Sequence, residues 1–246
     1  MTIAIPAVTR YLFLTTSLTR LLTFFGLLVF AHAVSGQPIR HVGIYVQPYY
    51  VSGASEGDPP QVAVAAKFDT RLASTDPATI AQVRDEIMSQ PEWITPMTMM
   101  VLAIRLYDVG LRDDAVFWFY AAKDRYATVA AVLNVSHPLL AQSRHAVAGF
   151  AGTAGYFING YAFCDLQKQA AARRAAADWV EAHPYQTLFV ESFPALSGDR
   201  QANLLRAVAS IRESVEKERD FVQTPANLER LRTAREESGA VQKYCW

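Results

Sequence analysis

A short uncharged run of apolar residues near the N-terminus limits what this chain can fold into more than any other feature of its sequence. The run spans 21–34, follows the cations Arg10 and Arg20, and ends in small residues. Cations, a brief apolar stretch and small side chains in this order are typical of a secretory signal peptide. The run holds 14 residues, fewer than the roughly 20 that a membrane-spanning helix needs. We therefore predict that residues 1–36 are a cleaved signal peptide and that the mature chain folds outside the cytoplasm.

Two cleavage positions are open, after Ala33 and after Gly36. Retention of the leader as a membrane anchor and a misassigned start codon are the alternatives to cleavage. No cysteine stands at the end of the apolar run, which excludes a lipid-anchored lipoprotein. Arginine outnumbers lysine by 18 to 5, a composition typical of a GC-rich bacterial genome. The expected location is periplasmic or secreted, with membrane contact only if the leader is retained.

The two cysteines, Cys164 and Cys245, both lie in the predicted mature chain. In an oxidising compartment a lone pair of cysteines is most simply a disulfide. This bond would close a loop of about 80 residues and stabilise the fold by roughly 4 kcal/mol in the chain-entropy model. Two separate buried thiols are the alternative.

The charge balance argues against a nucleic-acid partner. The chain has 23 basic and 23 acidic residues, and loss of a leader with two arginines and no acid leaves a net charge of −2. Binding to phosphates would need clustered lysine and arginine. The apolar fraction of 51% is enough for a substantial buried core.

Residues 37–75 differ from the rest of the chain. Apolar side chains alternate with other residues over 42–46 and again over 62–68, and a polar loop rich in glycine and proline, 52–60, separates the two stretches. Alternation with a period of two is typical of a strand. The pattern predicts a small β-hairpin, which must pack on the helices behind it because two strands are not stable alone.

Residues that typically begin or end helices recur from Asp76 to the C-terminus. Asp76-Pro77 and Thr95-Pro96 each place a capping side chain before a proline at the first helical position. The expected helices cover 76–89, 96–110, 113–133, a stretch from 138 onward, 165–182, 199–221 and 225–239. The sequence therefore predicts a mainly α fold, a globular multi-helix domain over 76–246 with a small N-terminal β-hairpin.

The segment 96–126 resembles one repeat of the tetratricopeptide family. Small and aromatic residues fall at the spacing of that helical hairpin: Leu102, Ala103, Gly110, Ala115, Phe119 and Ala122. Small residues let two antiparallel helices approach closely. A step of 34 residues forward meets Arg144 and Thr153 in place of the turn glycine and the seam phenylalanine. We therefore expect a single hairpin inside a globular domain, and the resemblance implies protein–protein binding.

Two serine motifs do not have the surroundings that catalysis needs. Ser55 lies in a G-x-S-x-G sequence, but Asp58 and two prolines follow it where a nucleophile elbow needs a helix. Ser214 and Lys217 match S-x-x-K, but the companion K-T-G and S-D-N motifs are absent. A solvated loop and an exposed helix face are expected instead, and no catalytic residue is assigned.

The four histidines of the mature chain lack the spacing of a metal site. Helical metal sites place ligands four residues apart or in tight cysteine and histidine pairs. His145, near Val147 and Phe150 inside a predicted helix, is the one histidine considered for proton transfer. An ordinary partly buried histidine is the alternative. No metal and no other cofactor is predicted.

The longest uncharged stretch of the mature chain, 146–164, is compatible with three structures. Its length suits a membrane span, but it contains four glycines and polar residues. A ligand pocket could use Tyr156, Asn159 and Tyr161 as polar groups beside the glycines. A central buried element, whose small residues let neighbouring helices pack tightly, is the interpretation that we favour.

The aromatic run 117–120 covers most of a helix circumference, because successive residues step by about 100°. All four rings can be buried only if the helix is surrounded by others. Otherwise Trp118 and Tyr120 are the residues expected on a binding groove, since interfaces favour tryptophan and tyrosine.

These observations together predict an exported, non-enzymatic helical protein. It would bind another envelope protein or serve a structural role in the bacterial envelope. An envelope hydrolase with an acidic site that no motif marks, and a small-ligand-binding protein, are the alternatives.

Overall fold

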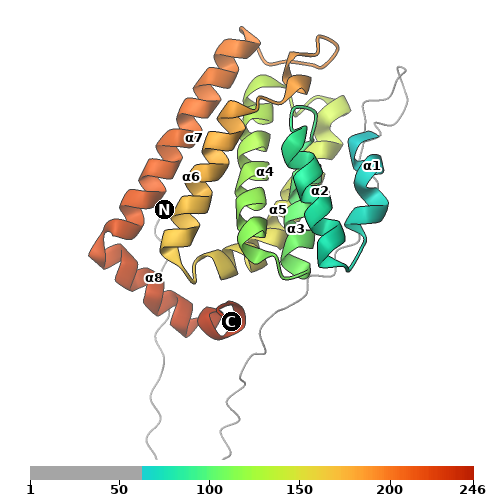
Figure 1. The fold of residues 1–246 in the computed structure, drawn as a ribbon. Helices are drawn as coiled ribbons and strands as arrows, with labels where there is room; N and C mark the ends of the chain where they lie inside the picture. Colours follow the sequence, from blue (N-terminus) through green and yellow to red (C-terminus); the bar gives the residue numbers. More distant parts are fainter. Residues whose placement is uncertain (1–62) are drawn as a thin grey trace, which may run out of the picture. The chain divides into compact units, whose positions relative to one another are not determined.

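The computed structural model describes residues 63–246, and this part of the chain is built from α-helices (Figure 1). The helices are α1 (Ala63–Leu72), α2 (Pro77–Ser89), α3 (Pro96–Asp108), α4 (Arg112–Val132), α5 (Pro138–Ala162), α6 (Leu166–Ala182), α7 (Arg200–Gln223), α8 (Pro225–Glu237) and α9 (Ala240–Tyr244). A 3-10 turn, η1 (Gln186–Phe189), connects α6 to α7, and an isolated antiparallel bridge joins Leu133 to Ala195. The prediction of a mainly α fold is confirmed.

The prediction of a second hairpin strand over 62–68 is wrong, because Ala63–Leu72 is helix α1. Most residues of this stretch are apolar, so the apolar positions fit a period of four as well as a period of two. Phe68 and Leu72, four residues apart, are buried and join the core where α1 contacts α2 and α3. The first predicted strand, 42–46, and the predicted signal peptide lie outside the described residues.

Four of the helices begin at capping side chains that the sequence predicts. Asp76 accepts hydrogen bonds from two backbone N–H groups of the first turn of α2, and Thr95 accepts one from α3. Asp165 and Asp199 cap α6 and α7 in the same way. Gly110, with a φ of 89°, makes the turn between α3 and α4, a conformation that favours glycine. Local capping therefore sets the starts of these four helices, whereas α4, α8 and α9 begin without a side-chain cap.

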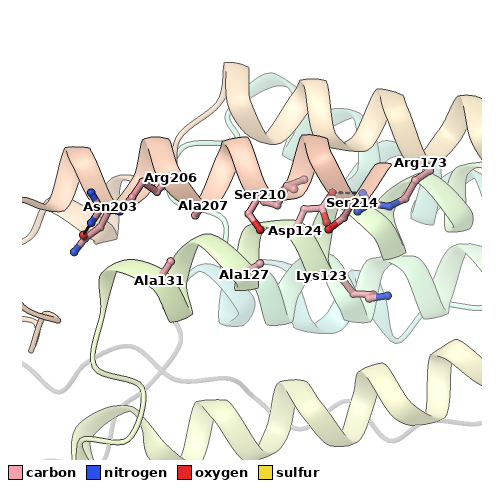
Figure 2. A pocket seen from close by; sticks show the side chains of 11 residues that line it. Lys123, Asp124, Ala127, Ala131, Arg173, Asn203, Arg206, Ala207, Ser210 and Ser214 are labelled. Atoms are coloured by element: carbon pink, nitrogen blue, oxygen red, sulfur yellow. Dashed lines mark hydrogen bonds and ion pairs between the residues drawn. The ribbon is translucent and has the colours of Figure 1, made fainter. Parts of the chain in front are cut away.

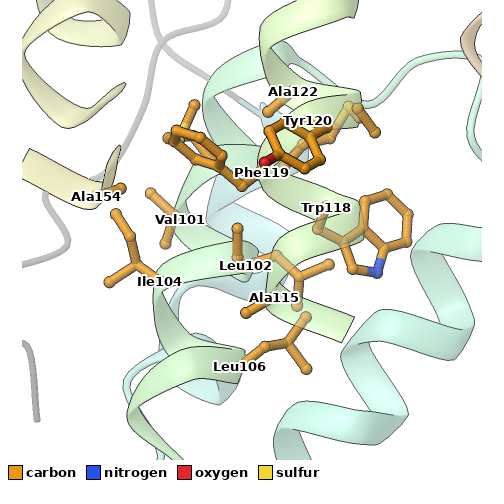
Figure 3. Packing of buried hydrophobic residues seen from close by; sticks show 14 of the residues in the cluster. Val101, Leu102, Ile104, Leu106, Ala115, Trp118, Phe119, Tyr120, Ala122 and Ala154 are labelled. Carbon is orange, nitrogen blue, oxygen red and sulfur yellow. The ribbon is translucent and has the colours of Figure 1, made fainter. Parts of the chain in front are cut away.

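The core is built around the hairpin of α3 and α4. In Figure 1, α4 lies between α6 and α3, and it contacts α3, α5, α6 and α7. Leu102 and Leu106 of α3 pack with Ala115 and Phe119 of α4 in the buried cluster of Figure 3. Because neighbours surround both helices, α3 is buried along nearly its whole length and α4 on most of its faces.

Helix α5 carries most of the uncharged stretch 146–164, and only one of its faces is buried. Ala154 and Ile158 join the core, where α5 contacts α3 and α4, whereas Gly152 and Tyr156 are exposed. The expectation of a central buried element is therefore corrected to a helix at the edge of the core. Among residues 63–246, no helix combines the length and the apolar character needed to cross a membrane.

Candidate functional site

Trp118 and Tyr120, two of the predicted binding residues, belong to the core (Figure 3). Their side chains are only 1% and 4% exposed. The ring of Trp118 lies 5.3 Å from that of Trp179 on α6. The Tyr120 hydroxyl donates to Oδ1 of Asn159 at 3.3 Å and accepts from Nε2 of Gln169 at 3.1 Å. The idea of a groove on these two side chains is corrected, because α5 and α6 cover them.

Cys164 and Cys245 form the predicted disulfide. Their Cα atoms are 5.4 Å apart, although 81 positions separate them in the sequence. Arg235 of α8 lies beside the bond, and its Nη2 donates to the carbonyl of Gly160 at 3.0 Å and lies 3.3 Å from Sγ of Cys245. The disulfide and this arginine fasten the C-terminal segment to the end of α5.

Aromatic rings and a guanidinium group gather where the C-terminal segment meets α5. We call this cluster the aromatic end surface, and its members are Tyr107, Arg112, Tyr156, Phe157, Tyr244 and Trp246. The ring of Tyr156 lies 5.7 Å from that of Tyr244, and the guanidinium of Arg112 lies 3.6 Å from the centre of the Trp246 ring. Tyr156 is 59% exposed and Trp246 is 37% exposed. One predicted binding residue, Tyr156, therefore lies on an exposed aromatic surface.

The other two predicted binding residues of α5 have separate partners. The Tyr161 hydroxyl donates to Oδ1 of Asp113 at 2.8 Å, and Nζ of Lys168 lies 3.2 Å from Oδ2 of the same carboxylate. The hydrogen bond from Tyr161, with a contribution from Lys168, lowers the pKa of Asp113. Burial and the contact with Asp113 raise the pKa of Tyr161 to about 12. Asn159 is bonded to Tyr120, so Tyr156, Asn159 and Tyr161 do not share one set of contacts.

A groove of about 510 Å³ runs between α4 and α7 (Figure 2). Ala127 and Ala131 line it from α4, and Ala207 and Ser210 line it from α7. Small side chains on both helices leave a hollow that longer side chains would fill. The groove therefore arises from the small side chains at the contact between α4 and α7.

Besides Arg173 of α6, two cations line this groove, Lys123 of α4 and Arg206 of α7. Within residues 63–246, neither has a carboxylate at ion-pair distance. Nζ of Lys123 lies 5.4 Å from the centre of the Phe119 ring, and Nη2 of Arg206 donates to Oδ1 of Asn203. Both cations consequently keep charge and N–H donors available to a bound molecule.

The carboxylate that lines the groove, Asp124, is already occupied. It is buried and bonded to Nη1 of Arg173, and Nε of the same arginine donates to Oε2 of Glu218 at 3.1 Å. Burial raises the pKa of Asp124, and the charge of Arg173 opposes this rise. Asp124 therefore does not cancel the charge of the two flanking cations.

The motifs rejected at the sequence level do not assemble into a catalytic site. Ser214 lines the groove, but Nζ of Lys217 lies 2.6 Å from a carboxylate oxygen of Glu213. His145 is exposed on α5, and Ser55 lies outside the described residues. Among residues 63–246, no group of three or more His, Cys, Asp and Glu side chains is placed to hold a metal ion.

The sequence is similar to that of an uncharacterized protein of Haemophilus influenzae. The two are 34% identical over 214 residues, which cover 87% of this chain and 82% of the relative. The chain belongs to the family of that protein. No family model and no solved structure matches the chain.

Sequence reasoning did not find the groove, because its two walls come from α4 and α7, which are distant in the chain. A partial signal was present. Arg206, Ser210 and Ser214 recur every four residues on one face of α7, and Ala127 and Ala131 have the same spacing on α4. Only their juxtaposition in the fold makes these two stripes the walls of a groove.

Proposed function

We propose that this protein is an exported, non-enzymatic component of the bacterial envelope, that it binds another envelope protein or serves a structural role there, and that the aromatic end surface is its contact face. The observation that carries the proposal is the exposure of Tyr156 and Trp246 beside Arg112. Tyrosine, tryptophan and arginine are the residues that contribute most to binding energy at protein interfaces.

The rigidity of this surface supports a binding role. The disulfide of Cys245 and the contact of Tyr244 with α5 hold the C-terminal segment in place. Side chains that are already ordered lose less conformational entropy when a partner binds. Held in this way, the aromatic end surface resembles a preformed binding site.

The same disulfide supports export, because such bonds persist mainly in oxidising compartments. The expected mature protein begins after Ala33 or after Gly36. N-terminal sequencing of the protein from a periplasmic fraction tests this part of the proposal. Recovery of a chain that begins at Met1 from the cytosol, with Cys164 and Cys245 both reduced, would overturn it.

Site-specific photo-crosslinking tests the contact face. A photoreactive phenylalanine analogue at position 156, introduced in the native host, is expected to give a discrete crosslinked species with an envelope protein. Leu205 and Phe221 on α7 are 60% and 48% exposed, so the same analogue at positions 205 and 221 provides controls of similar accessibility.

The crosslink at position 156 is expected to weaken in a Trp246→Ala variant, because that ring contributes to the same surface. A crosslink of equal strength at positions 205 and 221 would show that the contact is not specific. Absence of any crosslink at position 156 would remove the support for this contact face.

An envelope hydrolase is the second candidate function, and one observation favours it. Asp124 lines the α4–α7 groove with a pKa that burial raises, a property that general acids share. Its bond to Arg173 argues for a structural role instead. Loss of hydrolysis of a peptide, ester or glycoside substrate in an Asp124→Asn variant that keeps its fold would favour the enzyme.

A further inference from the structure

We infer that the groove between α4 and α7 binds an elongated small molecule that carries a carboxylate at each end. The inference concerns a site apart from the aromatic end surface, and it stands whether or not a protein partner binds there. It rests on the placement of the cations, on the small residues between them, and on the ion pair that occupies Asp124.

The two cations lie at opposite ends of the groove. Figure 2 shows Arg206 across from Ala131 toward one end, and Lys123 next to Asp124 at the end where Ser214 lies. Arg206 and Ser214 are eight positions apart on α7, which corresponds to about 12 Å along the helix axis. A molecule that meets both cations must therefore be extended, with its two negative groups separated by a chain of several atoms.

The charges at these ends are available to a ligand. Among the described residues, no carboxylate pairs with Lys123 or Arg206, and Asp124 is held by Arg173. The planar guanidinium of Arg206 offers several N–H donors in a geometry that suits a carboxylate. Arg206 is the cation at one end, and at the other end the charge of Arg173, which also lines the groove, is matched by Asp124 and Glu218. One unmatched cation at each end suits a singly charged carboxylate better than a phosphate.

The stretch between the cations suits an aliphatic chain. Ala127, Ala207 and Ile211 line it with methyl and methylene groups, and the hydroxyl of Ser210 adds one polar group. Apolar contact with this surface would stabilise the methylene chain of a ligand. The volume of about 510 Å³ lies within the range of small-molecule sites.

Titration with a series of aliphatic dicarboxylates tests the inference on the mature, disulfide-bonded protein. Succinate, adipate, suberate and sebacate are compared by isothermal titration calorimetry at low salt, and octanoate serves as the probe with the chain length of suberate but one carboxylate. Affinity is expected to peak at a longer diacid and to be roughly ten-fold weaker for octanoate. Binding should weaken as salt is added, because the cations are partly exposed.

Variants assign the binding to the groove. Arg206→Ala and Lys123→Ala are each expected to weaken the binding of the tightest diacid by roughly ten-fold or more. Arg230→Ala is a matched control, because Arg230 on α8 makes the same kind of hydrogen bond, from its Nη2 to Oδ1 of an asparagine three residues earlier, at 2.6 Å. Ser210→Leu fills the groove without a change of charge and is expected to abolish binding.

Three results would overturn the inference. The first is the absence of measurable binding by every diacid of the series. The second is equal affinity for octanoate and suberate. The third is the same loss of affinity in Arg230→Ala as in Arg206→Ala. Both arginines are exposed, so circular dichroism is expected to show an intact fold in each of these variants.

Discussion

The backbone of Gly160 on α5 lies against the ring of Tyr244 on α9, and a Cβ atom at position 160 would be only 2.6 Å from Cδ2 of that ring. The next residue after Tyr244 is Cys245, whose disulfide returns to the end of α5. The C-terminal helix can therefore lie flat on α5 only because position 160 has no side chain.

Gly160→Ala is expected to destabilise the protein by about 1–2 kcal/mol. The added methyl group must displace the Tyr244 ring, and overpacking of this kind costs about 1–3 kcal/mol. The higher helix propensity of alanine returns up to about 1 kcal/mol. Urea denaturation followed by circular dichroism measures the difference.

Gly152→Ala on the same helix is the control for this substitution. A Cβ atom at position 152 meets no other atom within 4 Å, so only the helix propensity changes. This variant is expected to be more stable than the wild type by up to about 1 kcal/mol. Equal stability of the two glycine variants would contradict the contact between Gly160 and Tyr244.

Removal of the disulfide by the double substitution Cys164→Ser and Cys245→Ser is expected to cost about 2–4 kcal/mol. The bond closes a long loop, so its loss increases the conformational entropy of the unfolded chain. Chemical denaturation of the oxidised wild type and of the variant measures this cost. Rapid alkylation of both thiols in the native, unreduced protein would show that the bond does not form.

Arg173→Met is expected to destabilise the fold by about 3–5 kcal/mol, because it leaves Asp124 buried without its cation. The added substitution Asp124→Leu should recover part of this loss, since it removes the unpaired charge. Arg174→Met is the control, because Arg174 is exposed and its nearest carboxylate contact is 4.0 Å. A double variant no more stable than Arg173→Met would argue against a paired role.

The same pair predicts a dependence of stability on pH. Burial raises the pKa of Asp124 in the folded state, and Arg173 opposes that rise, so Arg173→Met should raise it further. When the pKa of a carboxyl is higher in the folded protein than in the unfolded chain, where it is about 3.9, protonation of that carboxyl stabilises the fold. This stabilisation is complete below the unfolded pKa and is lost as the pH rises through the folded pKa. Arg173→Met should therefore gain more stability than the wild type when pH is lowered from about 7 to about 5. Denaturation midpoints at both pH values test this.

Substitution of Arg125 is expected to destabilise the fold more than substitution of most other core residues. Its guanidinium is fully buried and donates to the carbonyl oxygens of Pro91, Ile94 and His183. Burial lowers its pKa to about 10, so it keeps its charge at neutral pH. Arg125→Met should cost about 2–4 kcal/mol, because three buried acceptors lose their donor.

The control for Arg125→Met is Arg144→Met on α5, since Arg144 makes two long contacts, of 3.4 Å with Ser136 and 3.5 Å with His145. The free energy of unfolding of the Arg144→Met variant is expected to differ from that of the wild type by less than about 0.5 kcal/mol. Similar losses in the two variants, measured by urea denaturation, would mean that the three carbonyl contacts of Arg125 contribute little.

Features that depend on neighbouring residues were predictable from the sequence. The caps at Asp76, Thr95, Asp165 and Asp199 mark helix starts because a side chain bonds to N–H groups two or three residues away. The pairing of Cys164 with Cys245, which joins distant positions, was predictable because two cysteines in a chain expected to be exported most simply pair with each other. Neither prediction needs knowledge of how distant segments pack.

Apart from the disulfide, the tertiary structure decided what depends on contacts between distant segments. The alternation at 62–68 suited a strand, but burial of Phe68 and Leu72 against α2 and α3 made it a helix. Trp118 and Tyr120 could have lined a groove, and the packing of α5 and α6 covered them instead. The α4–α7 groove and the contact of the Tyr244 ring with Gly160 each form where two helices far apart in the chain meet. The free energy of such contacts depends on how closely the side chains of the two helices fit together, and no local sequence pattern encodes that fit.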